Sequence, residues 1–178
     1  MNVKGDMEPV FNTQTVKNKS SEIMWNMNSN DLYYTGKSNK KAPIEIGINY
    51  FLDGKSVSAE EVAGASGTVK IEFTFTNNYT KAVKVNGKTR KMYLPMVVVG
   101  GTIFAESKIT EITTENGMTL GDGSNEIAGV FSIPGVGPSL GIGSEDLEGY
   151  GDIKLNDKAS ITVKTDCFEL GNMYFAAI

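Results

Sequence analysis

The segment "GTVKIEFTFTN", residues 67–77, constrains the fold more than any other part of the chain. Apolar and polar side chains alternate through it without a break. Successive side chains of a β-strand point to opposite faces of a sheet, so this alternation predicts a strand with one face in a core and the other in water. The expected inward set is Val69, Ile71, Phe73 and Phe75, and the expected outward set is Lys70, Glu72, Thr74 and Thr76.

Several other segments also have the character of strands. "APIEIGINYFL" repeats the alternation and ends at Asp53-Gly54, and "KAVKVNGKTRKMYL" carries Asn86-Gly87, a strong signal for a hairpin with a two-residue turn. "MYLPMVVVGGTIF" is apolar almost throughout, which predicts a strand covered on both faces, with a bulge or an edge at Pro95. Two shorter candidates, "EIMWNM" and "DLYYTG", precede these segments.

The second half of the chain adds further strand signals. "SKITEITTENGMTLGDGSNEIAGVFSIPG" predicts two or three strands with turns at Asn116-Gly117 and Asp122-Gly123, and a final pair, "ASITVKTDCFEL" and "MYFAAI", is joined at Gly171-Asn172. Together these make about nine or ten short strands, a pattern typical of a mostly antiparallel sandwich. The predicted fold class is therefore all-β, an immunoglobulin-like β-sandwich.

The expected domain organisation is a linker-like segment over residues 1–20 followed by a β-sandwich over 21–178. Two packed β-subdomains that meet near residues 40–45 are the alternative. One short helical turn is expected at 58–64, because Ser58 and Glu61 have the spacing of a capping box and Gly64 can end the turn in a left-handed conformation. This turn is interpreted as a structural crossover between strands, with a ligand-contacting loop as the alternative.

Composition excludes several classes of function. The chain contains no His, which removes Ser/His/Asp and Cys/His catalysis and His-ligated zinc. The net charge is −4 with Lys and Arg scattered among Asp and Glu, so no nucleic-acid partner is expected. No apolar run approaches the roughly 18 residues of a membrane helix. The polar opening "MNVKGDMEPVFN" is typical of a piece cut from a longer polypeptide.

Cys167 is the single cysteine, so it has no intramolecular disulfide partner. Within "ASITVKTDCFEL" it falls in the same alternating set as Ile161 and Val163. This placement predicts a buried structural cysteine rather than a reactive nucleophile.

Three segments carry a resemblance to a known family: "PIEIGINYFLDGKSVSAEEVAGASGTVKIEFTFTN", then "MYLPMVVVGGTIF", then "GMTLGDGSNEIAGVFSIPGV". Their order over residues 30–135 resembles the extracellular region of uncharacterised membrane-anchored cell-surface proteins of Gram-positive gut bacteria, clostridia and relatives. The resemblance implies export, a position at the cell surface and a membrane anchor outside this segment. It implies no particular activity.

The glycine-rich segment 135–151 is the first candidate for a site. A phosphate-binding loop would need a helix N-terminus and usually a Lys after the glycines, and neither follows Gly143, so a surface loop is expected. Its apolar residues are too widely spaced for a regular strand, and we interpret them as an interaction surface that a partner orders. The residues of this surface are Val136, Leu140, Ile142, Leu147 and Tyr150.

Aromatic residues give the alternative function, a carbohydrate-binding module in which rings stack on sugar faces. Trp25, Tyr33 and Tyr34 would form the platform, although a single Trp in a β-sandwich is more often part of the core. Tyr79, Tyr93 and Tyr150 are further candidates for it.

No catalytic, cofactor-binding or metal residues are assigned. Two groups of oxygen ligands could bind calcium, but their spacing does not match an EF-hand loop, so solvated turn carboxylates are expected instead. The groups are Asp122, Ser124, Asn125 and Glu126, and then Glu145, Asp146, Asp152 and Asp157. Paired carboxylates could hydrolyse glycosides, but the 21 acidic residues make chance pairs inevitable.

The expected function is therefore non-enzymatic, a structural or adhesive interaction at a bacterial cell surface. The expected partners are a protein or glycan at that surface and neighbouring domains of the same polypeptide.

Overall fold

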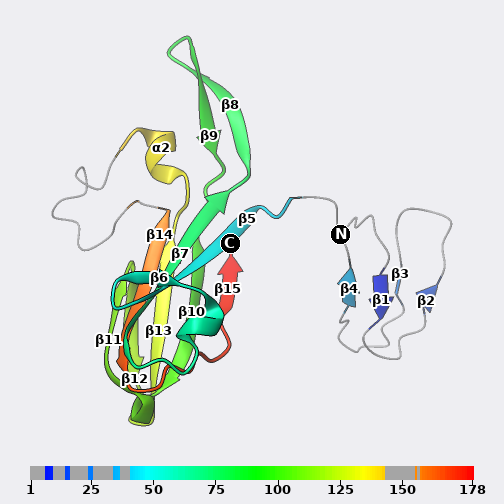
Figure 1. Cartoon of the computed structure of the whole chain (residues 1–178). Helices are drawn as coiled ribbons and strands as arrows, with labels where there is room; N and C mark the ends of the chain where they lie inside the picture. Colours follow the sequence, from blue (N-terminus) through cyan, green and yellow to red (C-terminus); the bar gives the residue numbers. More distant parts are fainter. Residues whose placement is uncertain are drawn as a thin grey trace. The chain divides into compact units, whose positions relative to one another are not determined.

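The computed structural model describes residues 7–9, 15–16, 24–25, 34–36, 41–142, 155 and 157–178, and the chain divides into two compact units, Met1–Ala42 and Pro43–Ile178. In the first unit the described residues form two short antiparallel pairs (Figure 1). Strand β1 (Met7–Pro9) pairs with β4 (Tyr34–Gly36), and β2 (Thr15–Val16) pairs with β3 (Met24–Trp25).

In the second unit the described residues form two larger sheets, and each strand pair in them is antiparallel. The five-stranded sheet has the order β11 (Ile109–Glu115), β14 (Lys158–Thr165), β7 (Gly67–Asn77), β5 (Ile44–Leu52) and β6 (Lys55–Val57). The four-stranded sheet has the order β12 (Gly117–Gly121), β13 (Asn125–Ser132), β10 (Val98–Ala105) and β15 (Tyr174–Ala177).

The described residues of this unit also form three short helices and a separate hairpin. The hairpin consists of β8 (Thr80–Val85) and β9 (Lys88–Tyr93), and it projects beyond the end of the two sheets (Figure 1). The helices are α1 (Ala59–Val62), the 3-10 helix η1 (Glu106–Lys108) and α2 (Val136–Leu140).

A single hydrophobic core holds the two larger sheets together. The inward residues of β7, which are Val69, Ile71, Phe73 and Phe75, are all 0–1 % exposed. They share one buried cluster with Val98 and Phe104 of β10, with Ala128 and Val130 of β13 and with Ile161 and Val163 of β14. The predicted all-β, sandwich-like fold is confirmed, and so is the predicted inward set of residues 67–77.

Aromatic rings from different sheets contact one another inside this core. The ring of Phe175 on β15 meets that of Phe73 edge-on, with centroids 5.4 Å apart, and lies 6.3 Å from that of Phe75. Gly100 of β10 makes room for this arrangement, because a Cβ there would overlap the Phe175 ring. The edge strand β15 is thereby fixed against the centre of the opposite sheet.

The turn and cap chemistry predicted from sequence is also confirmed. Asp53 and Gly54 have φ of 48° and 81°, and Asn86 and Gly87 have φ of 50° and 75°, as a type I′ turn requires. The Ser58 Oγ accepts from the Glu61 backbone N–H at 3.2 Å, and the Glu61 carboxylate accepts from the Ser58 N–H at 2.8 Å. Gly64 follows with φ of 75°.

The connections in the second half of the chain join strands of different sheets. A turn is predicted at Asn116-Gly117, and there Asn116, with φ of 51°, passes the chain from β11 in one sheet to β12 in the other. Its side-chain amide donates to the Lys158 carbonyl at 2.9 Å, which fixes this corner. Likewise β14 and β15 belong to different sheets and are not a hairpin.

The glycine-rich segment also differs from the prediction, because part of it is helix rather than loop. Helix α2 begins after Gly135 and ends before Gly141, and both glycines have left-handed backbone conformations. Residues 143–154 lie outside the described residues.

We expect Phe73→Ala to lower the free energy of unfolding by about 3–5 kcal/mol, because it removes the ring that contacts Phe75 and Phe175 and leaves a cavity. Urea unfolding followed by circular dichroism measures this. Thr74→Ala on the outer face of the same strand is the control and should change stability by less than about 0.5 kcal/mol. Equal losses for both variants would mean that the register of β7 is wrong.

We expect Gly87→Val to weaken the β8–β9 hairpin, because a β-branched residue resists the φ of 75° at this position. Hydrogen exchange should therefore accelerate at the backbone amides of β8 and β9. Asn86→Gly is the matched control, since glycine tolerates the same conformation, and exchange should stay close to that of the unmodified chain. Unchanged exchange in Gly87→Val would contradict the tight-turn assignment.

Candidate interaction surfaces

The outer face of the four-stranded sheet is apolar, and it is the first candidate surface. Strand β10 was predicted to be covered on both faces, and this is wrong. Its inward residues Val98, Thr102 and Phe104 are 1–2 % exposed, whereas Val99 and Ile103 on the other side are 41 % and 52 % exposed. The sequence suggested coverage on both faces because apolar residues occur in both alternating sets of this strand. The set that contains Val99 and Ile103 faces solvent instead.

The strand register continues this apolar surface across the sheet. Ile103 lies opposite Ile127 of β13, and Ile127 lies opposite Leu120 of β12. On the other side of β10, Val99 lies opposite Ala176 of β15. We call this set the outer sheet face and define it by its exposed apolar side chains, Val99, Ile103, Met118, Leu120, Ile127 and Tyr174.

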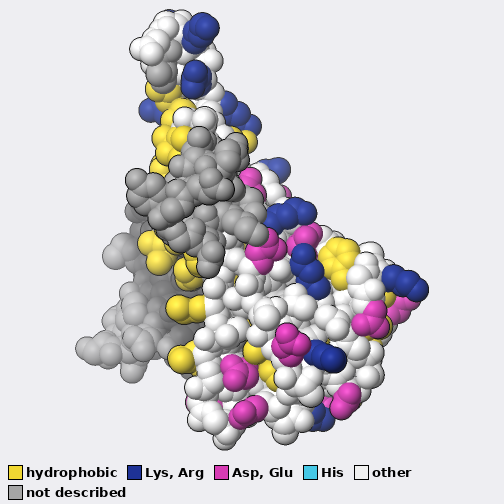
Figure 2. All heavy atoms as spheres, turned by 90° about the vertical axis from the view of Figure 1, so that its left-hand side faces the viewer, with side chains coloured by type: hydrophobic (Ala, Val, Ile, Leu, Met, Phe, Trp, Pro, Cys, Tyr) yellow, Lys and Arg dark blue, Asp and Glu magenta, His cyan; other side chains and the backbone are white. Residues whose placement is uncertain are grey.

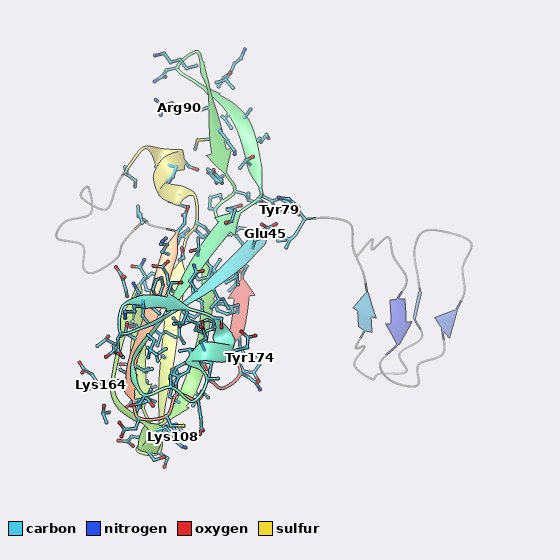
Figure 3. The ribbon with its side chains drawn as sticks, in the orientation of Figure 1. Glu45, Tyr79, Arg90, Lys108, Lys164 and Tyr174 are labelled. Carbon is cyan, nitrogen blue, oxygen red and sulfur yellow. The ribbon has the colours of Figure 1, made fainter. Side chains whose placement is uncertain are left out.

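A shallow hollow lies on the outer sheet face. Gly101 of β10 pairs with Gly129 of β13 on one side and with Tyr174 of β15 on the other, so no side chain fills the surface between Val99 and Ile103. The hollow has a volume of about 430 Å³. Tyr174 of β15, labelled in Figure 3, is among the residues that line the hollow and is 69 % exposed.

The five-stranded sheet has the opposite character. Its outward positions on β7 carry Lys70, Glu72 and Thr74. Glu72 accepts from Lys158 at 3.0 Å and lies 3.7 Å from the ammonium of Lys70. One sheet of the sandwich therefore has an ordinary solvated surface, and the other sheet has an apolar one.

The second candidate surface is an apolar groove between the β8–β9 hairpin and α2. It has a volume of about 850 Å³, within the range of about 300–1,000 Å³ found for small-molecule sites. Tyr79, Val83 and Met92 line it from the hairpin side, and Val136 and Leu140 line it from α2. Leu94 and Leu140 are 55 % and 59 % exposed at the groove.

Hydrogen bonds hold α2 against the base of the hairpin. The Ser139 Oγ accepts from the Tyr93 backbone N–H at 2.8 Å and donates to the Gly135 carbonyl at 2.7 Å. The Gly135 N–H donates in turn to the Asp157 carboxylate at 2.9 Å. The buried Asn77 amide donates to the Leu94 carbonyl at 2.8 Å. Hydrogen bonds therefore hold α2 and the base of the hairpin in place on the two sides of the groove.

The residues predicted from sequence as an interaction surface fall partly on this groove. Val136 and Leu140 line it, and Ile142 is half-buried just after α2. Leu147 and Tyr150 lie outside the described residues. Sequence reasoning missed the hairpin wall, because Val83 and Met92 lie on different strands and come together only through the pairing of β8 with β9.

The residues of the carbohydrate-binding alternative fall in separate elements of the backbone. Trp25 lies in β3 and Tyr34 in β4, which belong to different strand pairs, and Tyr33 lies outside the described residues. Tyr79 and Tyr93 both line the groove.

Cys167 differs from the prediction of a buried strand residue. Strand β14 ends at Thr165, so Cys167 lies beyond the ladder and is half-buried. Its backbone N–H donates to the Thr165 hydroxyl at 3.1 Å.

The candidate calcium ligands that are described make the contacts of a turn. The Asp122 carboxylate accepts from the backbone N–H groups of Ser124 at 2.9 Å and Asn125 at 2.7 Å, and these bonds lower the pKa of Asp122. Within the described ranges no three His, Cys, Asp or Glu side chains lie close enough together to hold a metal ion. Glu145, Asp146 and Asp152 lie outside those ranges.

Two other pKa shifts have local causes of the same kind. The backbone bond from Ser58 lowers the pKa of Glu61, and the Glu169 carboxylate, 2.8 Å away, raises the pKa of Lys108. Asp122, Glu61 and Lys108 are exposed, and they belong to a turn, a helix cap and a surface ion pair, respectively.

Comparison with protein-family models, with curated proteins and with solved structures finds no match to this chain. In the part of the chain that the structure describes, neither α1 nor α2 has the length and apolar character needed to cross a bilayer.

Proposed function

We propose that this chain is a non-enzymatic interaction domain that binds a protein partner through the outer sheet face. The observation that supports the proposal is the difference between the outward-facing side chains of the two sheets of the sandwich. The outward face of the five-stranded sheet carries the half-buried polar residues Lys70, Glu72 and Thr74, whereas the outer sheet face carries Ile103, Leu120 and other exposed apolar side chains. Burying such a surface against a partner would be favourable at about 25 cal/mol per Å².

The dimensions of the sheet support a contact of moderate size. Four strands about 4.8 Å apart and about six residues long on average cover on the order of 400 Å² of plane. The largest apolar patch of a typical monomer is about 300–600 Å² and is often functional. A stable interface buries about 800 Å² on each partner, so the outer sheet face would form its apolar centre within a polar rim.

The setting that we propose is the exterior of a bacterial cell, in a membrane-anchored protein with a structural or adhesive role. The resemblance of the "YFLDGKSVSAEEVAGASG" and "DGSNEIAGVFSIPG" segments to such surface proteins supports this part of the proposal. The partner would then be a protein of that surface or a neighbouring domain of the same polypeptide.

Site-specific photo-cross-linking in cells that produce the protein tests the contact. A photoreactive amino acid at Met118, which is 73 % exposed on the outer sheet face, should yield a cross-linked protein adduct. The same amino acid at Thr113, exposed on β11 of the five-stranded sheet, is the matched control and should yield little or none. Equal cross-linking from both positions, or from Thr113 alone, would overturn the proposal.

A further inference from the structure

The β8–β9 hairpin departs from the scattered charge expected for the chain, because it carries charge of one sign. Residues 79–94 contain five cationic side chains and no Asp or Glu, although the chain as a whole has a net charge of −4. The five are Lys81, Lys84, Lys88, Arg90 and Lys91, and all are exposed. Within the ranges that the structure describes, none of them pairs with a carboxylate.

The strand register arranges these charges without direct repulsion. Each cationic residue lies opposite an uncharged one, for example Arg90 opposite Val83 and Lys81 opposite Met92. Like charges directly opposite one another would destabilise the ladder, and this pairing avoids that cost. Lys91 also lies 5.2 Å from the centre of the Tyr93 ring. The hairpin can therefore hold a concentrated positive charge and stay folded.

One face of the hairpin carries both cationic side chains and residues that line the apolar groove. Directly opposed residues share a face of a two-stranded ladder, so Lys81, Val83, Arg90 and Met92 lie on the same side. Lys81, Val83 and Met92 line the groove. Figure 2 shows Lys and Arg side chains at the projecting end of the molecule with apolar side chains below them. Arg90 lies near that end (Figure 3).

We propose that the β8–β9 hairpin docks on the surface of a lipid bilayer that contains anionic phospholipid. Lys81 and Arg90 bind lipid phosphates, and the exposed apolar side chains of the groove, Leu94 and Leu140 among them, contact the acyl region. Clusters of four to eight cationic residues bind anionic lipid at about 1 kcal/mol for each Lys or Arg near the surface. A polyanion without acyl chains would satisfy the charges but would leave the groove apolar and exposed.

This site is separate from the outer sheet face, so the inference goes beyond the proposed function and can fail independently of it. The test is sedimentation of the full 178-residue chain with phosphatidylcholine vesicles and with vesicles of equal parts phosphatidylcholine and phosphatidylglycerol. The chain should bind the anionic vesicles, release on addition of salt, and bind phosphatidylcholine weakly. Equal binding to both vesicles, or to neither, would overturn the proposal.

Paired variants then locate the contact. K81Q/R90Q should weaken partition to the anionic vesicles by about 10- to 30-fold, because two phosphate contacts are lost. K55Q/K164Q removes the same charge from exposed positions on β6 and β14 and is the control, with a smaller effect expected. If the two double variants lose partition equally, the binding follows net charge and the hairpin is not the site.

A second pair of variants tests the contribution of the apolar side chains to vesicle binding. Leu140→Asn at the groove should weaken partition several-fold, and Leu120→Asn on the outer sheet face should not, although both leucines are similarly exposed at 59 % and 65 %. If only Leu120→Asn weakens partition to the vesicles, the bilayer contacts the outer sheet face rather than the groove, and the proposal is overturned. If Leu140→Asn instead binds the anionic vesicles as well as the unmodified chain does, and inorganic polyphosphate displaces both proteins from them equally, the hairpin binds anions in general. That result would also overturn the proposal.

Discussion

The contact of Phe175 with Phe73 and Phe75 is the constraint on which the arrangement of the two sheets depends. These rings come from an edge strand of one sheet and the central strand of the other, and their centroids lie 5.4 Å and 6.3 Å apart. Gly100 supplies the space that the Phe175 ring occupies. Because aromatic pairs of this kind bury large areas in a specific geometry, they fix β15 in register beside β10.

Fixing the inward face of the four-stranded sheet also determines its outward face. With Phe175 inward, its neighbours Tyr174 and Ala176 point outward and extend the apolar surface formed by Val99 and Ile103. An antiparallel sheet with one face in a core normally presents polar residues on the other, as β7 does. The four-stranded sheet departs from this rule, and the departure supports a role in contact rather than in stability.

Strands and turns whose signals are local could be predicted from sequence, and features that depend on distant contacts could not. Alternation over residues 67–77, the Asn86-Gly87 turn and the Ser58–Glu61 capping box each reflect neighbours in the chain. The passage of Asn116 between sheets depends on its bond to the Lys158 carbonyl, and α2 depends on the bond between Ser139 and Tyr93. The groove was half predicted, since Val136 and Leu140 were expected at a surface but Val83 and Met92 reach it only through the hairpin.

The four-stranded sheet has a filled inner face and an apolar outer face that is open to solvent. Methyl NMR of the full chain with a soluble nitroxide tests this arrangement most directly, at a concentration where sedimentation shows a monomer. The methyl signals of Ile103 and Ile127, which are 52 % and 40 % exposed, should broaden strongly, whereas those of the buried Ile71 and Ile161 should not. Protection of Ile103 and Ile127 to the level of Ile71 would contradict the account.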